Sequence, residues 1–222
     1  MKIITKIINA IILIALLNAC AGIAKNLTKI DYNENVKKNT ALLNKVPAGK
    51  ASVGTLLYWK KNGNLYMLIG KENNNKKGGG TWCELGGSVK KNESFLAAVI
   101  RETSEESGGT YLLNSDYIIK HGITHHTIKP NGREELYIIL EAPAYYTGKQ
   151  ILEKINKQTK NSYKEKVELI WVLAKDLFLC NQNRCVLQDI KGHRHNGIKL
   201  RNFFQEILKD LNFKEKIKII QN

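Results

Sequence analysis

The chain has 222 residues, and several features that mark common protein classes are missing from it. Its apolar run at Ile7–Leu17 has about half of the ~20 residues that a bilayer-spanning helix needs. No internal repeat is present, which excludes a solenoid or a propeller. No basic run is interleaved with aromatic residues, so nucleic acid is not expected as a partner.

Acidic residues are also scarce. The 35 Lys and Arg outnumber the 20 Asp and Glu, which gives a formal net charge of +15. Such a balance favours polyanionic partners such as nucleotides or anionic membrane surfaces. The lysines are spread through the chain among many Asn and Ile residues, however, so compositional drift explains much of the charge. The hydrophobic content of 43% is enough for one sizeable domain with a proper core.

The N-terminus has the features of an export signal. Lys2 and Lys6 precede the short apolar run, which ends at Leu17-Asn18-Ala19-Cys20 and resembles a bacterial lipobox. We therefore expect a signal peptide at 1–19, a tether at 20–48, and a membrane-anchored lipoprotein with a lipid on Cys20, facing the periplasm or the cell exterior. An ordinary cleaved signal or an uncleaved anchor would leave Cys20 incidental. If the signal is not used, the protein is cytoplasmic.

After a domain edge near Pro47-Ala48-Gly49, the pattern predicts strands, a helix, further strands and a last helix. Asn62-Gly63 and Asn131-Gly132 predict turns, and residues 71–80 predict a polar loop. The expected helices are a short one near 40–43, one at 93–106, part of 143–163 and one at 198–211. The expected strands are 53–59, 65–70, 81–85, 117–126, 135–142 and 167–172.

The stretch Gly87–Gly109 carries the chemistry. Nothing interrupts a helix from Glu93 to Glu106, for which Asn92 is a plausible N-cap and Gly108-Gly109 suit the end. Several carboxylates on one side of that helix would repel one another. A hard divalent cation removes this repulsion, and magnesium commonly lies between carboxylates and substrate phosphates. A solvated acidic helix face is the alternative. On this helix Glu102 and Glu106 lie one turn apart, and Glu105 falls between them on the same side.

The spacing of Gly87, Glu93, Arg101-Glu102, Glu105-Glu106 and Gly108 resembles the Nudix box of the Nudix hydrolases. Seven fixed positions would match by chance in a chain this long about once in a million times. The chain departs from the box where the family has aliphatic residues or a proline, namely at Thr103, Gly109 and Leu85. These departures concern packing and leave every charged position in place.

The resemblance implies an α/β (α+β) fold, a Nudix-type α/β/α sandwich with a mixed β-sheet between helices. We assign residues 49–212 to this domain and 213–222 to a basic C-terminal tail. It also implies a metal-dependent hydrolase that cleaves a phosphoanhydride in a nucleoside diphosphate linked to another group. A nucleotide-like small molecule is then the expected partner; homodimer formation is left open.

The resemblance also assigns roles by position. Glu102, Glu105 and Glu106 would hold Mg²⁺ or Mn²⁺, and Arg101 would orient the carboxylates. Glu93 would pair with a cation or support an outer metal ion, and Gly86 and Gly87 would let the backbone approach metal or phosphate. The general base stays open between Glu105 and the carboxylates further along the chain, Glu134, Glu135 and Glu141. Trp82, Tyr145 and Tyr146 are candidates for stacking on a base, or core residues.

Two readings compete for Cys180 and Cys185. They close a small loop, and an exported protein could join them in a disulfide, which would leave Cys83 as a buried free thiol. Alternatively they could bind zinc with His193 and His195, although the histidine spacing is tight for that. Two further alternatives concern the whole chain: a Nudix-fold module that binds a nucleotide without hydrolysis, and an interaction protein at a membrane surface.

Overall fold

The computed structural model describes residues 33–75, 78–160, 163–180 and 184–221. The expected signal peptide, Cys20 and the first part of the tether lie outside these residues. Residues 33–43 are helical, so the short helix expected near 40–43 begins earlier than predicted. The chain divides into two units, Met1–Ala41 and Leu42–Asn222, and the second holds the sheet. None of the helices in the described part of the chain has the length and apolarity that a bilayer span requires.

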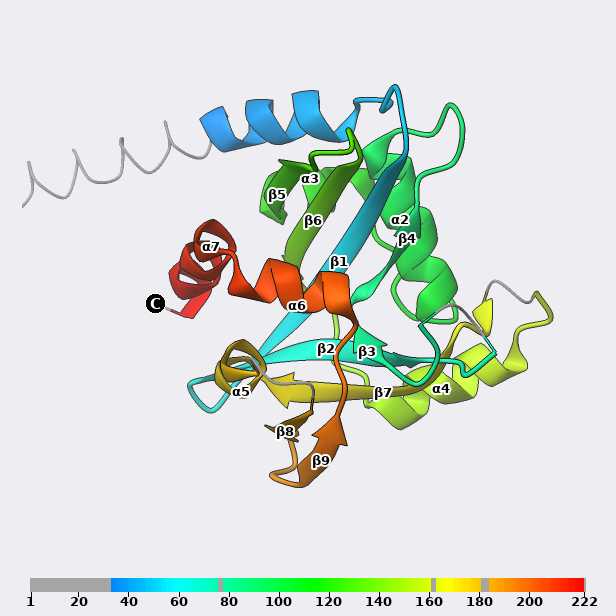
Figure 1. Ribbon diagram of the computed structural model, residues 1–222, viewed down its shortest axis with the longest axis vertical. Helices are drawn as coiled ribbons and strands as arrows, with labels where there is room; N and C mark the ends of the chain where they lie inside the picture. Colours follow the sequence, from blue (N-terminus) through cyan, green and yellow to red (C-terminus); the bar gives the residue numbers. More distant parts are fainter. Residues whose placement is uncertain (1–32, 76–77, 161–162, 181–183, 222) are drawn as a thin grey trace, which may run out of the picture. The chain divides into compact units, whose positions relative to one another are not determined.

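A mixed sheet organises the second unit (Figure 1). Its described strands follow the order β3-β2-β1-β6-β5, with β4 added beside β1 and β7 beside β2. β1 runs parallel to β6 and antiparallel to its other partners. The strands are β1 (Ala51–Lys61), β2 (Asn64–Glu72), β3 (Trp82–Cys83), β4 (Leu85–Ser88), β5 (Ile123–Ile128), β6 (Glu134–Glu141), β7 (Lys166–Leu173) and the separate hairpin β8 (Cys185–Gln188) and β9 (Arg194–Ile198).

Helices cover both faces of this sheet, as the two hydrophobic clusters show. On one face, α2, α3 and α4 contribute buried side chains such as Phe95, Ile118 and Ile151. On the other face, α5, α6 and α7 contribute side chains such as Leu177 and Phe204. The predicted sandwich is therefore confirmed. The helices are α2 (Phe95–Glu106), α3 (Ser115–His121), α4 (Gly148–Lys157), α5 (Ala174–Leu179), α6 (Asn202–Lys209) and α7 (Leu211–Gln221).

Local signals explain the first hairpin and the central helix. Asn62 and Gly63 both have positive φ, as the tight turn between β1 and β2 requires. The N-cap of α2 is Ser94, whose hydroxyl accepts from the Ala97 N–H, and not the predicted Asn92, which lies in the left-handed region. Gly108 also adopts positive φ, which ends the helix as expected.

Three predictions for other elements are wrong. Residues 117–121 belong to helix α3, not to a strand, because the Asn114 side chain caps that helix and basic residues end it. Ile198 ends β9, and the helix expected from that residue begins only at Asn202. The expected basic tail is helix α7, which buries Phe213, Ile217 and Ile220 in the core.

Cys180 and Cys185 form a disulfide. Both sulfur atoms are thereby used, so the zinc alternative is excluded. His193 and His195 instead contact the carboxylate of Asp189, at 3.3 and 3.0 Å. Cys83 is the buried free thiol that the disulfide reading predicted.

Candidate active site

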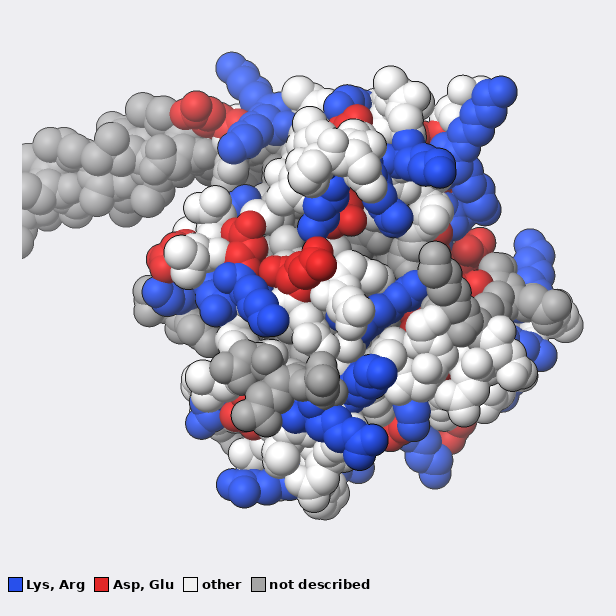
Figure 2. Space-filling view, in the orientation of Figure 1, with Lys and Arg blue, Asp and Glu red and all other residues white. Residues whose placement is uncertain are grey.

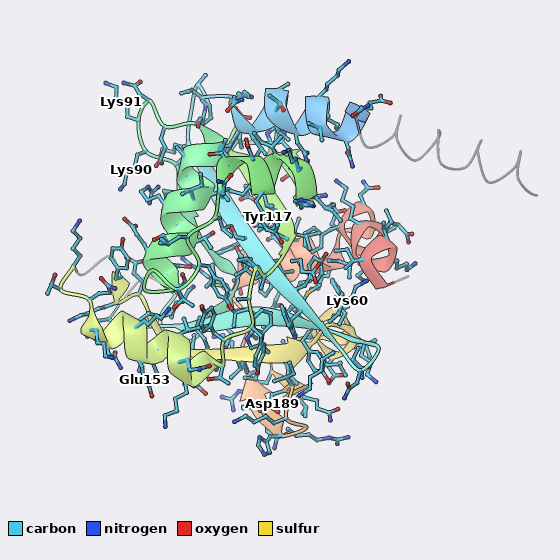
Figure 3. The ribbon with its side chains drawn as sticks, turned by 180° about the vertical axis from the view of Figure 1, so that it is seen from behind. Lys60, Lys90, Lys91, Tyr117, Glu153 and Asp189 are labelled. Carbon is cyan, nitrogen blue, oxygen red and sulfur yellow. A yellow bond between two sulfur atoms is a disulfide. The ribbon has the colours of Figure 1, made fainter. Side chains whose placement is uncertain are left out.

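The site lies where β4 passes the C-terminal half of α2. A cavity of about 460 Å³ opens there, and it contains most of the residues that the box assigns. The residues that line it are Glu72, Gly86, Gly87, Ser88, Lys90, Arg101, Glu102, Glu105, Glu106, Glu165 and Arg201. The loop before α2 carries Lys90 and Lys91 at the edge of this region, with both side chains extending outward (Figure 3).

Packing of α2 on the sheet fixes the position of its carboxylates. Thr103, where the family has an aliphatic residue, is fully buried, and its hydroxyl forms a 2.8 Å hydrogen bond with that of Thr55 on β1. The pair satisfies two buried polar groups, so the departure from the box does not disturb the helix. Leu85, where the family has proline, is likewise part of the core.

The two glycines of β4 leave space for backbone and carboxylates. A methyl group at Gly86 would lie 2.2 Å from the carbonyl oxygen of Val53 on β1. A methyl group at Gly87 would lie 2.6 Å from the carboxyl carbon of Glu102. Instead, the Gly86 N–H donates a 2.6 Å hydrogen bond to Oε2 of Glu106. Gly86 is therefore required for the close approach of β4 to β1, and Gly87 leaves space for the Glu102 carboxylate of α2.

Arg101 holds the outer carboxylates together. Its Nε and Nη2 donate to the two oxygens of Glu93 at 2.7 and 2.9 Å, which is a bidentate pair. Its Nη1 donates to Glu102 at 2.6 Å and to Glu105 at 3.4 Å, and Nη2 also reaches the Ser88 carbonyl. The hydrogen bonds from Arg101 lower the pKa of Glu93. Glu93 does not line the cavity; it contacts two residues that do, Arg101 through its side chain and Lys90 through its backbone N–H.

Glu106 is the innermost box carboxylate. It is buried, and burial raises its pKa to about 8. Burial also raises the pKa of Glu102. Carboxyl groups that are costly to ionise are stabilised as anions when a cation binds to them.

A second group of buried ionisable residues lies behind Glu106, and sequence reasoning missed it. Lys166 on β7 is 3.3 Å from Glu106 and 2.8 Å from Glu72 on β2. Burial opposes the charged ammonium, but the neighbouring carboxylates raise the pKa of Lys166 well above its ordinary value. Burial likewise opposes the Glu72 anion, yet Lys166, Cys83 and Arg201 together lower the pKa of Glu72. In the sequence, Glu72 and Lys166 stand in polar segments and look solvent-exposed. They are buried because β2 pairs with β7.

The donor set fits a divalent metal. All box carboxylates present oxygen, the ligand that magnesium and manganese prefer. Carboxylate oxygens of Glu72, Glu106 and Glu165 also lie within 4.8 Å of one another, with the Lys166 ammonium against the first two. Glu102, Glu105 and Glu106 would hold the ion on the cavity side, where it would neutralise charge on a substrate phosphate.

The candidates for the general base beyond the box differ in whether they line the cavity. Glu134 pairs with Lys45 and His126, and Glu141 lies exposed at the far end of β6, so neither lines the cavity. Glu135 lines an adjoining hollow of about 140 Å³. Glu105 is the candidate that lies in the carboxylate cavity itself. Trp82, Tyr145 and Tyr146 do not line either space: Trp82 is buried, and the two tyrosines pack near Trp171 and Tyr111.

Glu84, also missed from the sequence, is a buried carboxyl whose Oε2 has no hydrogen-bond partner among the described residues. Burial raises its pKa to about 7. Because this value lies above the unfolded-state value of about 4.5, Glu84 binds its proton more tightly in the folded protein. Its contribution to stability is complete below pH 4.5 and is lost as pH rises through 7.

Glu84→Gln is therefore expected to become more stable relative to wild type by roughly 2–3 kcal/mol between pH 5 and pH 8. Urea unfolding of both proteins across this range measures the difference. Glu153→Gln, on the exposed face of α4 (Figure 3), is the control and should run parallel to wild type. If the free energy of unfolding of Glu84→Gln also changed with pH in parallel with that of wild type, Glu84 would ionise in the folded protein at no cost in stability.

A family model described as the NUDIX domain matches residues 49–190, which is more than half of the chain. A comparison with curated protein sequences gave no match.

Solved structures give remote likenesses. A MutT/nudix family protein from Enterococcus faecalis is 15% identical, with a TM-score of 0.48 over 80% of this chain and 64% of that one. This chain thus spans less than two thirds of the Enterococcus protein. The Nudix hydrolase RenU from M. smegmatis is 17% identical, with a TM-score of 0.47 over 77% of this chain and 88% of that one. A MutT protein from Methanosarcina mazei is 19% identical, with a TM-score of 0.44 over 76% and 94%.

Proposed function

The chain belongs to the Nudix domain family, and from this we propose that it is a metal-dependent hydrolase of a nucleoside diphosphate linked to another group. The observation that supports this best is the set of box residues around one cavity: Gly86, Gly87, Arg101, Glu102, Glu105 and Glu106. A magnesium or manganese ion held there would neutralise the phosphoryl oxygens and activate water for attack on phosphorus.

The chain's own groups supply positioning. Arg101 ties Glu102, Glu105 and Glu93 into one arrangement, so the metal ligands are held before the substrate binds. Glu105, at the outer end of this arrangement, is our proposed general base. A Glu105→Gln variant with full turnover would remove it from that role.

The adjoining hollow is a suitable place for the rest of the substrate. It shares Gly86, Gly87, Ser88 and Arg201 with the carboxylate cavity. Beyond these it is lined by Arg133, by the carboxyl groups of Glu84 and Glu135 and by the rings of Tyr137 and Phe203. The Arg201 guanidinium stacks 4.8 Å from the Phe203 ring. Guanidinium groups bind phosphate oxygens, and aromatic rings pack against a sugar or base. The guanidinium groups and the rings favour a phosphate that carries an organic group.

The surface charge does not point to a particular macromolecular partner. On the face shown in Figure 2, Lys and Arg side chains are spread out, with acidic patches between them. A single basic strip of the kind that follows a nucleic-acid backbone is not seen on that face.

The test is a panel of nucleoside diphosphate derivatives incubated with the purified protein and Mg²⁺ or Mn²⁺, with the products separated by chromatography. We expect cleavage of at least one compound at its phosphoanhydride, and none when the metal is chelated. Binding of nucleotides without cleavage of any compound would favour the binding-module alternative instead.

A further inference from the structure

Lys166 is a lysine enclosed by the site. It is the first residue of β7, its side chain is 0% exposed, and its Nζ donates to Glu72 Oε1 at 2.8 Å. The same nitrogen donates to Cys83 Sγ at 3.1 Å and to the Glu84 carbonyl at 3.2 Å, and lies 3.3 Å from Glu106 Oε2. An ammonium has three protons, so these neighbours satisfy it fully.

The sheet leaves space for this side chain. Gly70 on β2 pairs with Cys83 on one side and with Leu169 on the other. A methyl group at Gly70 would lie 2.8 Å from Cδ of Lys166. The lysine stem therefore crosses β2 where that strand has no side chain. The absence of a side chain at Gly70 thus gives the buried, ion-paired lysine its space.

The ammonium lies among ligands that would otherwise suit a metal ion. Carboxylate oxygens of Glu72, Glu106 and Glu165 come within 4.8 Å of one another, and Lys166 contacts the first two. Glu102 and Glu105 lie further out, paired with Arg101. Oε2 of Glu106 thus contacts a fixed cation, and Glu106 lines one cavity together with the other carboxylates of both groups.

We propose that Lys166 is an internal cation that takes the place of a metal ion between Glu72 and Glu106, so that exchangeable metal binds only through the box carboxylates. The proposal rests on the proposed function, because it assumes that the box carboxylates bind metal. A +1 charge close to Glu72 and Glu106 repels a divalent ion from the space between these two carboxylates. Lys166 is a positioning residue that sets how many metal ions the site accepts.

The test counts Mn²⁺ bound per chain, without nucleotide, from the electron paramagnetic resonance signal of free Mn²⁺. Lys166→Met is expected to bind one more ion than wild type. Lys175→Met, an exposed lysine on α5, is the matched control and should bind the same number as wild type. The double variant Lys166→Met/Glu72→Gln should also match wild type, because the space next to Glu106 then lacks a carboxylate. No gain in folded Lys166→Met would overturn the proposal.

Glu72→Gln alone keeps the test decisive if Lys166→Met does not fold. In the wild-type background this change should leave the Mn²⁺ count unaltered, because Lys166 and not a metal contacts Glu72. Loss of one ion in Glu72→Gln would overturn the proposal. Wild-type protein that binds no Mn²⁺ at all would instead contradict the proposed function, so the two failures are distinct.

Discussion

Glu106→Gln is expected to lower turnover of the substrate on the order of a thousandfold while the protein stays folded. The amide lacks the negative charge that holds a divalent cation. Its side-chain oxygen can still accept the Gly86 N–H, and Lys166 keeps its contact with Glu72. The variant therefore removes a ligand with little loss of packing. Steady-state hydrolysis measures the effect, and circular dichroism checks the fold.

Strand β7 offers a matched control for the Glu106→Gln substitution. Glu168 lies on β7, and its half-exposed side chain is 3.7 Å from Lys71, away from the cavity. Glu168→Gln should keep turnover within about twofold of wild type, because an exposed ion pair contributes little. Equal turnover in Glu106→Gln and wild type would remove Glu106 from the site.

Gly87→Ala is expected to reduce turnover about a hundredfold or more with a small change in stability. The added methyl group would lie 2.6 Å from the carboxyl carbon of Glu102, the end of a flexible side chain. Glu102 can move aside at low cost to folding, but it then leaves both the cavity and Arg101. Displacement of a positioned group by about 1 Å can cost a hundredfold in rate.

Gly49→Ala is the control for this glycine substitution. No atom lies within 4 Å of a methyl group at Gly49, so turnover and stability should match wild type. Thermal unfolding combined with steady-state kinetics separates the two effects. If Gly87→Ala unfolded at a much lower temperature than wild type, the glycine would serve the fold and not the position of Glu102.

The parts of the molecule that depend on neighbouring residues could be predicted from the sequence. Helix α2 and the Asn62-Gly63 turn follow from local spacing and turn chemistry. The box residues share one short segment, so predicting that segment brought most of them together at the cavity, apart from Glu93, which lies behind Arg101. The other carboxylates and the guanidinium that line the cavity, Glu72, Glu165 and Arg201, come from distant segments and were not predicted.

The parts that depend on distant residues could not be predicted. Lys214, Lys216 and Lys218 gave residues 213–222 the composition of a solvated tail, although Phe213 and Ile217 sit one turn apart and both are buried. The inner charge cluster joins β2, α2 and β7, whose residues lie up to 94 positions apart in the chain. No local pattern distinguishes a buried Lys166 from the exposed lysines around it.

The most direct test of the central claim, a divalent metal site formed by the box carboxylates, is an anomalous difference map from crystals of the protein soaked in Mn²⁺. We predict a peak in the cavity within coordination distance of carboxylate oxygens of Glu102 and Glu106, lost in Glu106→Gln. Absence of any peak in that cavity at saturating Mn²⁺, with the carboxylates still paired to Arg101 and Lys166, would contradict the claim.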